Sequence, residues 1–376
     1  MKFSVPSKAL YNISSGVSKV INPKNALAIL NNFLITLDND KLSVTGSDVE
    51  NALTATIPVT NSEGTGSFCI DARRMVDLLK EMPDQGMEFV IDEETLEVNI
   101  SCSDGKYELV ATQGNQYPEY KKEEDDETPV SFKCSAKDFL KGIENTLFAV
   151  GQDDFHPQMM GILLDIKEDD LTFVATDTRK LVKFTNSNIK PNAMKRCILP
   201  YKPASILKSA FSKDDNITIT VTRKSATFES SVYKFNCRFI KGSFPDYTRV
   251  IPKNNPYELR VNRLFFLNAV RRVGVFIDPG YGMEKFKITN DHIEIKTSDP
   301  NLCTMGNEKV KCEYSGPEIV IGFSGPYLIE ICNVLPTEDI IIKLSDPSRP
   351  GVLMPTENEE GTDLVMLLMP MNVNEF

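Results

Sequence analysis

The sequence predicts an α+β protein built from three copies of one unit, each with two helices packed on antiparallel sheet. Two observations carry this prediction. Four sequence signals recur in the same order along the 376 residues, and each recurs after about one third of the chain. Between them lie short segments in which apolar and polar residues alternate, as in strands with one buried face. We therefore predict domains at residues 1–125, 126–251 and 252–376.

The first signal is a strand that runs into an amphipathic helix, at FSVPSKALYNISSGV, FKCSAKDFLKGIENTL and LRVNRLFFLNAVRRV. Apolar residues recur there at helical spacing and predict helices at 7–20, 135–150 and 262–277. These apolar residues are Leu10, Ile13, Val17 and Val20, then Phe139, Ile143 and Leu147, then Phe266, Ala269, Val270 and Val273. Ser135 with Asp138 is a capping-box pattern, and Asn262 is the expected N-cap of the third helix.

The second signal is a strand that ends in a small residue and an aspartate. The aspartates are Asp48, Asp177 and Asp299. They could be catalytic carboxylates, but an acid that is repeated three times without a histidine partner is more typical of a turn cap.

The third signal is another strand-to-helix step, at SFCIDARRMVDLLKEM, RCILPYKPASILKSAF and IVIGFSGPYLIEICNVL, which predicts helices at 71–83, 200–213 and 324–336. The fourth signal closes each unit with an aromatic residue or Met before a proline, at Pro118, Pro245 and Pro370. Four signals in the same register identify a repeat.

Strands are expected between these helices, for example at KLSVTGS, LTFVATD, NITITVTR, ATFESSVYKF, HIEIKTS and IIIKLS. Two segments have the composition of linkers: the acidic run KKEEDDET at 121–128 and IPKNNP at 251–256. These positions agree with the predicted domain boundaries.

The composition excludes several classes of protein. With 41% hydrophobic and 25% charged residues, the chain is globular, and no apolar run approaches the length of a membrane helix. The N-terminus lacks the apolar region of a secretory signal, so a cytoplasmic location is expected. Eight cysteines without a CxxC pair indicate reduced thiols. His156 and His292 are the only histidines, and no HExxH, GxSxG or Walker A motif occurs, so we expect no catalytic site, metal or cofactor.

Charge is segregated along this acidic chain. The net charge is −11, yet the six predicted helical windows together carry +7, which leaves −18 on the rest. The basic residues of the helices include Arg73, Lys137, Lys202, Arg271 and Arg272. Solvated helix faces are the ordinary explanation of such charges. The alternative is sequence-independent binding to nucleic-acid phosphates, because no base-reading motif is present.

Ring geometry favours the second reading. A unit of this length has a diameter of roughly 35 Å. Three such units in a closed ring leave a hole of only about 5 Å, whereas six leave about 35 Å, enough for a duplex roughly 20 Å wide. A dimer, the commonest oligomer, supplies six.

The chain resembles the bacterial sliding clamp family, the β subunits of DNA polymerase III, along its whole length. The resemblance rests on the opening MKFSV, VATDTRKLV at 174–182, SFPDYTRVIP at 243–252, DPSRPGVL at 346–353 and the terminal LLMPM at 367–371. It implies three similar α+β domains (the DNA clamp fold) and a head-to-tail homodimeric ring whose helices line the pore. It also implies a non-enzymatic processivity factor of DNA replication that encircles duplex DNA and tethers the replicative polymerase. The clamp loader and repair proteins are further implied partners, through short linear peptides.

The resemblance also implies site residues. The peptide-binding pocket would comprise Met159, Gly161, Thr176, Thr178, Arg179, Leu181, Pro245, Arg249, Val250, Ser324, Tyr327, Leu368, Met369, Pro370 and Met371. Lys24, in the NPKN loop, would join the five basic helix residues in facing DNA. The dimer interface would comprise Tyr107, Leu109, Val275 and Phe276.

The chain departs from the family pattern at three places. Thr178-Arg179 stands where many relatives have Gly then His, and Pro157-Gln158 stands where some have tyrosines near the pore. The chain also continues past Met371, whereas related chains often end with Arg and a hydrophobic residue. The methionines could simply be core residues, or they could form a pocket that repacks around varied partners.

Two other functions are compatible with a three-repeat protein. One is an adaptor that binds proteins and no DNA, and the other is a carboxylate-based hydrolase. An adaptor gives no reason for basic helices, and no pair of acids stands out for the hydrolase. We therefore expect a DNA clamp.

Overall fold

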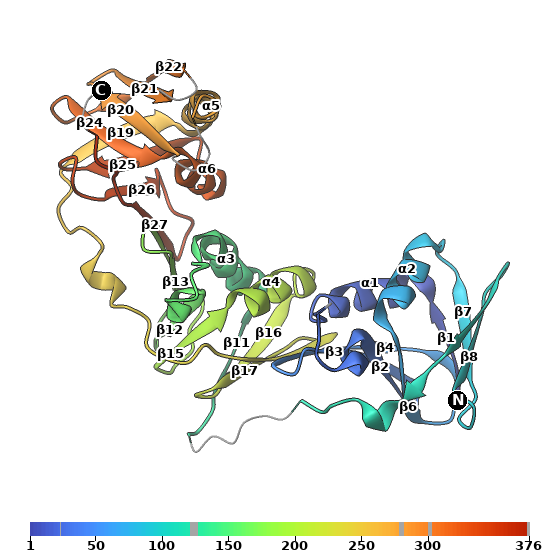
Figure 1. Ribbon diagram of the computed structural model, residues 1–376. Helices are drawn as coiled ribbons and strands as arrows, with labels where there is room; N and C mark the ends of the chain where they lie inside the picture. Colours follow the sequence, from blue (N-terminus) through green and yellow to red (C-terminus); the bar gives the residue numbers. More distant parts are fainter. Residues whose placement is uncertain (23, 121–126, 278–281, 300–302, 374–376) are drawn as a thin grey trace. The chain divides into compact units, whose positions relative to one another are not determined.

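The computed structural model describes the chain except residues 23, 121–126, 278–281, 300–302 and 374–376 (Figure 1). The chain forms two compact units. The first contains Met1–Leu140 and Lys202–Phe239, and the second contains Lys141–Tyr201 and Ile240–Phe376. The middle third of the chain therefore contributes to both units. Most of the predicted linker at 121–128 lies outside the described residues.

The described part of the chain has six α-helices, two in each third, where the sequence predicts them. They are α1 (Ser7–Ser18), α2 (Ala72–Glu81), α3 (Ala136–Thr146), α4 (Tyr201–Ala210), α5 (Arg263–Gly274) and α6 (Gly325–Val334). Asn262 accepts a hydrogen bond from the Phe265 amide at 3.1 Å, and Ser135 accepts one from the Asp138 amide at 3.4 Å. Both predicted caps are confirmed.

The strands follow the same order in each third. The first third has β1 (Lys2–Pro6), β2 (Asn32–Asp38), β3 (Lys41–Ser47), β4 (Asn51–Pro58), β5 (Thr60–Glu63), β6 (Gly66–Asp71), β7 (Gly86–Ile91), β8 (Glu97–Ser101), β9 (Lys106–Val110) and β10 (Thr112–Gln113). The second has β11 (Val130–Ser135), β12 (Gly161–Ile166), β13 (Leu171–Thr176), β14 (Lys180–Asn186), β15 (Lys195–Pro200), β16 (Asn216–Val221), β17 (Ser225–Glu229) and β18 (Tyr233–Arg238). The third has β19 (Tyr257–Asn262), β20 (Met283–Ile288), β21 (His292–Asp299), β22 (Thr304–Lys311), β23 (Glu313–Tyr314), β24 (Ile319–Ser324), β25 (Asp339–Leu344), β26 (Gly351–Pro355) and β27 (Thr362–Leu368).

The antiparallel pairing also repeats. The first strand of each third pairs with the strand after the second helix, as in β1–β7, β11–β16 and β19–β25. Two further strands extend each of these sheets on one side, and β5 and β23 add a strand on the other side in the first and last thirds. The other strands between the two helices form a second sheet, with the orders β6-β2-β3-β4, β15-β12-β13-β14 and β24-β20-β21-β22. Among the residues that the structure describes, each third therefore has two sheets and two helices.

Sheets merge across the boundaries between the thirds. β4 pairs with β18, with Ala55 opposite Tyr233, and makes a nine-stranded sheet in the first unit. β14 pairs with β27, with Lys180 opposite Leu368, and makes a nine-stranded sheet in the second unit. These joints explain why the two compact units cut through the middle third. Among the described residues, β9 and β22 remain edge strands of the other two sheets.

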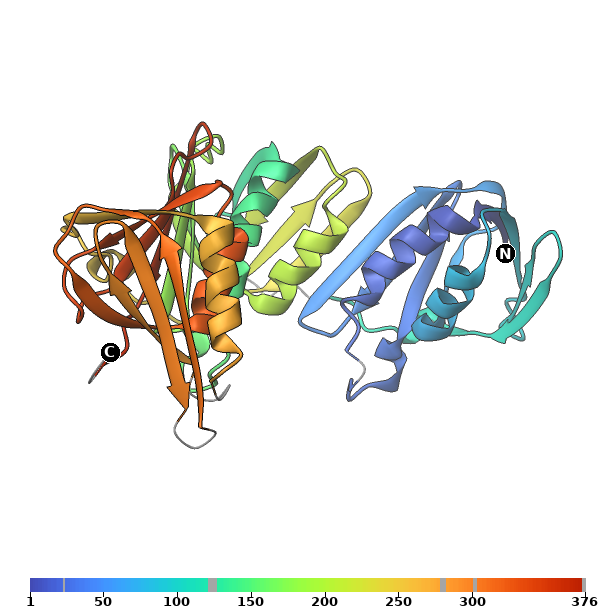
Figure 2. The same cartoon turned by 90° about the horizontal axis from the view of Figure 1, so that it is seen from above.

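The helices bury their apolar faces on these sheets. Figures 1 and 2 show α1 beside α2 in the first unit and α5 beside α6 in the second. The apolar positions predicted from helical spacing are buried in all three first helices, except Leu147, which is half-buried in a 3-10 turn after α3. No helix in the described part of the chain is long and apolar enough to cross a membrane.

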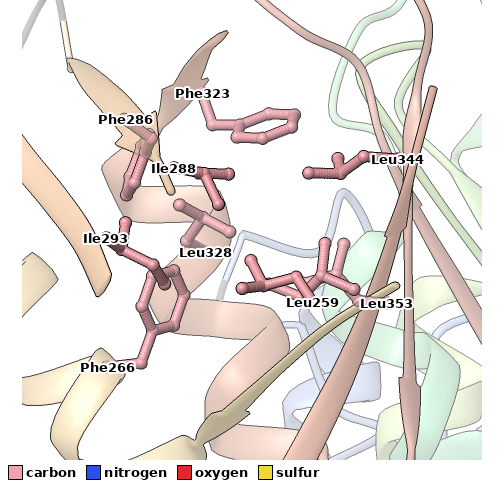
Figure 3. Close-up of a pocket in the computed structure, with 10 residues that line it drawn as sticks. Leu259, Phe266, Phe286, Ile288, Ile293, Phe323, Leu328, Leu344 and Leu353 are labelled. Atoms are coloured by element: carbon pink, nitrogen blue, oxygen red, sulfur yellow. The ribbon is translucent and has the colours of Figure 1, made fainter. Parts of the chain in front are cut away.

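The core of the last third contains a small cavity of about 10 Å³ (Figure 3). Its lining is entirely apolar, with Phe266 from α5, Phe286 from β20 and Phe323 from β24 around it. A site for a water molecule needs polar partners, which this lining lacks. The cavity is therefore a packing defect of the core and not a binding site.

One predicted strand is two strands. The segment ATFESSVYKF contains the end of β17, a turn and the start of β18. The Ser230 hydroxyl accepts hydrogen bonds from the amides of Val232, at 3.3 Å, and Tyr233, at 3.0 Å. This serine turn reverses the chain, which alternation alone does not reveal.

Candidate functional site

The turn between β13 and β14 organises one side of the predicted pocket. Asp177 accepts hydrogen bonds from the amides of Arg179, at 2.9 Å, and Lys180, at 2.8 Å. Asp48 accepts one from the Asn51 amide at 2.8 Å in the matching turn of the first third. Both aspartates are therefore turn caps, as predicted; the Asp299 side chain lies outside the described part of the structure.

Thr178 occupies a strained position in this turn. Its φ is 77°, in the left-handed region that suits glycine and disfavours a β-branched residue. The Thr178 amide donates to the Thr176 hydroxyl at 3.1 Å, and that hydroxyl donates to the Lys180 carbonyl at 2.7 Å. These bonds hold the turn, and the positive φ explains why glycine would suit a position where this chain has threonine.

The C-terminal tail is fastened beside this turn. The Met369 amide donates to the Arg179 carbonyl at 2.8 Å, directly after β27 pairs with β14. The Met371 amide donates to the Gly322 carbonyl of β24, also at 2.8 Å. Leu368 is buried, whereas the Met369 side chain is 38% exposed. The tail therefore lies between β14 and β24, with its methionines accessible at the rim.

Lys180 is a site residue that sequence analysis did not single out. It is only 4% exposed, and its ammonium lies 2.7 Å from Glu330, 3.1 Å from Asp177 and 4.1 Å from the centre of the Tyr327 ring. Burial alone would lower the pKa of Lys180, but Glu330 and Asp177 outweigh it and raise the pKa. Lys180 thus joins the turn to α6, the helix that carries Tyr327. Its position in a strand of alternating residues gave no signal of this.

The other pocket residues lie around the same sheet. Met159 precedes β12 and packs, together with Thr176, against the position of Gly151. Leu181 is buried in a cluster with Tyr247 and Leu367. Val250 is 47% exposed, and its amide donates to the Tyr247 carbonyl at 3.2 Å. The structure therefore brings residues from the second and third repeats to one place in the second unit. The Arg179 and Arg249 side chains add exposed charged groups to it.

The predicted interface residues lie at the two edge strands. Tyr107 is 37% exposed, and Leu109 is half-buried on β9. Val275 is 77% and Phe276 44% exposed directly after α5. The Phe276 ring packs beside Gly306 of β22, and its carbonyl accepts the Thr304 hydroxyl at 3.0 Å. One predicted pair therefore lies on the edge strand β9, and the other lies beside the edge strand β22.

The predicted DNA-facing residues differ in their electrostatic surroundings. Lys24, Arg73 and Lys137 are exposed. The Lys202 ammonium instead donates to Asp48 and to the Val20 carbonyl, each at 2.6 Å. Arg272 pairs with Glu308, and Arg271 donates to the Asn333 side chain at 3.0 Å. Because Asp48 and Glu308 neutralise part of this charge, Lys202 and Arg272 are the weaker candidates for phosphate contact.

Comparison with known proteins matches the whole architecture. Three family models match: the N-terminal domain of DNA polymerase III beta subunit at residues 1–121, the central domain at 133–246 and the C-terminal domain at 248–372. A "Beta sliding clamp" of Pseudomonas putida is 24% identical over 371 residues, covering 97% of this chain and 99% of that protein. One from Staphylococcus aureus is 24% identical over 377 residues, covering 97% and 98%.

Solved structures show the same fold. A DNA polymerase sliding clamp from Pseudomonas aeruginosa superimposes with a TM-score of 0.91 at 23% identity, covering 99% of this chain and 100% of that one. A DNA polymerase III beta subunit from Thermotoga maritima superimposes with a TM-score of 0.90 at 20% identity, covering 99% of each chain.

Proposed function

This chain belongs to the DNA polymerase III beta subunit family, and from that premise we propose how its residues do the work of a sliding clamp. The protein is a ring-shaped, non-catalytic processivity clamp of DNA replication, with DNA, the polymerase and a second protomer as partners. The fold class and the absence of an enzymatic role are confirmed by this membership. The domain boundaries and the individual site residues stay predictions.

The pairing of the sheets carries the proposal for ring closure. At each joint between repeats, the edge strand of the second sheet of one repeat (β4, then β14) pairs with the last strand of the next repeat (β18, then β27). The third repeat leaves β22 as an edge, and the first repeat leaves β9. The same kind of pairing between protomers would join β22 of one protomer to β9 of the next, because an edge strand presents unpaired amides and carbonyls. Head-to-tail closure of two protomers uses both edges twice.

The same closure gathers the predicted interface residues. Tyr107 and Leu109 lie on β9, and Phe276 packs beside β22. Aromatic anchors at the centre of an interface supply most of its affinity. Exposed apolar side chains at both edges therefore support this contact as the third joint of the ring.

DNA contact in this proposal is weak and independent of sequence. The six helices are net positive although the chain is acidic. Exposed lysines and arginines such as Lys24, Arg73 and Lys137 attract phosphates across water, where salt screens them. The ring, rather than affinity, then keeps the protein on DNA.

Retention is expected to be topological. Protein loaded on a nicked circular duplex should stay bound through gel filtration in high salt, and linearising the circle should release it within the same run. Salt removes phosphate contacts but cannot unlink a closed ring. Lys24→Ala with Lys137→Ala should weaken binding at low salt and leave high-salt retention on the circle unchanged. Equal retention on circular and linear DNA would contradict encirclement.

Partners are proposed to dock beside the tail in the second unit. Leu181 and Leu368 supply an apolar floor, the methionines adapt to varied side chains, and Arg179 and Arg249 offer donors at the rim. Short linear peptides with one Gln and a few hydrophobic residues fit such a surface. We propose that the polymerase, the clamp loader and repair proteins share it, in the cytoplasm.

Removing residues 369–376 is expected to abolish peptide binding. The deletion takes away Met369 and Met371 and their backbone bonds to Arg179 and Gly322, while β27 keeps its pairing with β14. Fluorescence anisotropy of a labelled peptide should then show at least about a hundredfold loss of affinity, the equivalent of about 2.7 kcal/mol. The matched control removes only residues 372–376 and should bind within a few-fold of the full chain. If the protein without residues 369–376 binds the peptide as tightly as the control and remains a dimer, the tail is only a core strand.

A further inference from the structure

Residues 240–251 form a strap across one face of the nine-stranded sheet of the second unit. Tyr247 lies in one cluster with Leu163 of β12, Val174 of β13 and Leu181 of β14. Ile240, Phe244 and Ile251 pack against the same cluster. The opposite face of β13 packs on α3, because the Phe173 ring occupies the space beside Gly142. The strap therefore covers the face that the helix leaves open.

The hydroxyl of Tyr247, the buried tyrosine of the strap, is hydrogen-bonded within a network of charged side chains. The Tyr247 hydroxyl donates to Oδ2 of Asp165 at 2.9 Å, and the Arg196 guanidinium donates to both oxygens of that carboxylate, at 2.8 and 2.9 Å. Asp165 is 3% and Tyr247 6% exposed. Burial, followed by the bond to Asp165, raises the pKa of Tyr247. A hydroxyl that donates to a carboxylate, itself bonded to a guanidinium, makes one of the stronger hydrogen bonds in proteins.

The strap turns sharply on either side of Tyr247. Asp246 accepts the Thr248 amide at 3.2 Å and the Thr248 hydroxyl at 2.7 Å. The Val250 amide donates to the Tyr247 carbonyl at 3.2 Å. This 3-10 turn, Tyr247–Arg249, directs the tyrosine inward and leaves Arg249 and Val250 exposed. Both exposed residues belong to the predicted pocket rim, whereas the cluster under Tyr247 contains Leu181 of its floor.

We propose that Tyr247, locked by Asp165 and Arg196, is a positioning residue that fixes the rim of the peptide pocket relative to its floor. The inference rests on the proposed function, because it gives the strap a role only if peptides dock there. Tyr247, Asp165 and Arg196 need not touch the peptide. They act by removing the freedom that Arg249 and Val250 would otherwise lose on binding, and pre-organisation of this kind raises affinity without new contacts.

The test uses the full-length dimer, a fluorescein-labelled peptide with one Gln and a hydrophobic end, and amide hydrogen exchange. Tyr247→Phe keeps the ring in the cluster and removes only the hydroxyl. We expect about tenfold weaker peptide binding and faster exchange confined to residues 240–251 in the peptide-free protein. Asp165→Asn keeps the shape but replaces the charged acceptor of the Tyr247 hydroxyl with a neutral amide, so it weakens the same bond and should have a similar effect. The double variant should bind no more weakly than the worse single variant, because both substitutions act on the same bond.

Tyr314→Phe is the matched control. Tyr314 is also 6% exposed and in the second unit, but its hydroxyl is buried without a hydrogen-bond partner among the described residues. Its removal should change neither peptide affinity nor exchange in the strap. A general loss of stability would affect exchange throughout the unit, which the rest of the exchange map reveals.

Each outcome decides the inference. If Tyr247→Phe binds the peptide with unchanged affinity, the inference is overturned, even where amide exchange in the strap becomes faster. Additive losses in the double variant also overturn it, because the two side chains would then act separately. If the wild type binds no peptide, the proposed pocket fails, and unchanged strap exchange in Tyr247→Phe separately overturns the lock. Should Tyr247→Phe not fold, Asp165→Asn carries the same measurements.

Discussion

A protein carrying both Val275→Asp and Phe276→Asp is expected to be a monomer and to be lost from circular DNA. Both side chains are exposed apolar groups at the end of α5, 77% and 44% exposed. Closure would bury them against β9 of the partner. Each carboxylate buried without a partner costs about 3–5 kcal/mol, and the variant would bury two, so the dimer dissociation constant should rise at least about a thousandfold.

The control for this variant lies on the same helix. Leu264 and Phe265 occupy the first turn of α5 and are 50% and 70% exposed. Leu264→Asp with Phe265→Asp makes the same chemical change at the other end of the helix and should remain dimeric. Light scattering gives the mass of each protein, and circular dichroism checks that both fold. A Val275/Phe276 variant that stays dimeric would place the interface elsewhere.

The second large effect concerns Glu284, a buried acid on β20. Glu284 is 1% exposed, its Oε2 has no hydrogen-bond partner among the described residues, and its carboxyl packs against Gly325 and Gly274. Burial raises the pKa of Glu284 to about 8. The folded protein therefore holds a proton that the unfolded chain has already lost above its ordinary pKa of 4.5.

The sign of the pH dependence follows from that difference. Between pH 4.5 and about 8 the native state binds more protons at Glu284, so its contribution to stability falls as pH rises. Replacing Glu284 with Gln removes this dependence. The quantity to compare is the unfolding free energy of Glu284→Gln minus that of the wild type. We expect this difference to be about 4 kcal/mol more favourable to the variant at pH 9 than at pH 5.

Urea unfolding at the two pH values checks this expectation. Any constant cost of the buried amide cancels in the comparison, because it is the same at both pH values. Glu313→Gln is the control, since Glu313 is exposed in the same third of the chain. A Glu284→Gln gain that does not change with pH would mean that the carboxyl reaches water or a partner.

Much of the fold could be predicted from local patterns. Helical spacing predicts α1, α3 and α5 and their buried faces, since a helix uses residues only three or four positions apart. Asn262 and Ser135 could be identified as caps because a cap bonds within three residues. Asp48 and Asp177 could be identified as turn residues for the same reason. The repeat of these short-range signals also predicts three units.

Contacts between distant residues could not be read in this way. Spacing within a strand does not say that β4 pairs with β18 or β14 with β27, because a period of two suits any antiparallel neighbour. The serine turn inside ATFESSVYKF is missed when the segment is taken as one strand, although Ser230 and Ser231 interrupt the alternation of apolar residues. The pocket residues came from resemblance to a family, not from spacing.

The sequence by itself therefore determined the helices, the threefold repeat and the family. Only the tertiary structure decided which charged side chains are free of acidic partners and which side chains are fixed by hydrogen bonds to distant residues. It buries Lys180 against Glu330, pairs Lys202 with Asp48, and locks Tyr247 to Asp165, each across more than 80 positions of the chain. Burial and charge pairing depend on what the fold brings within a few ångströms, and that distance is not encoded in the neighbouring residues.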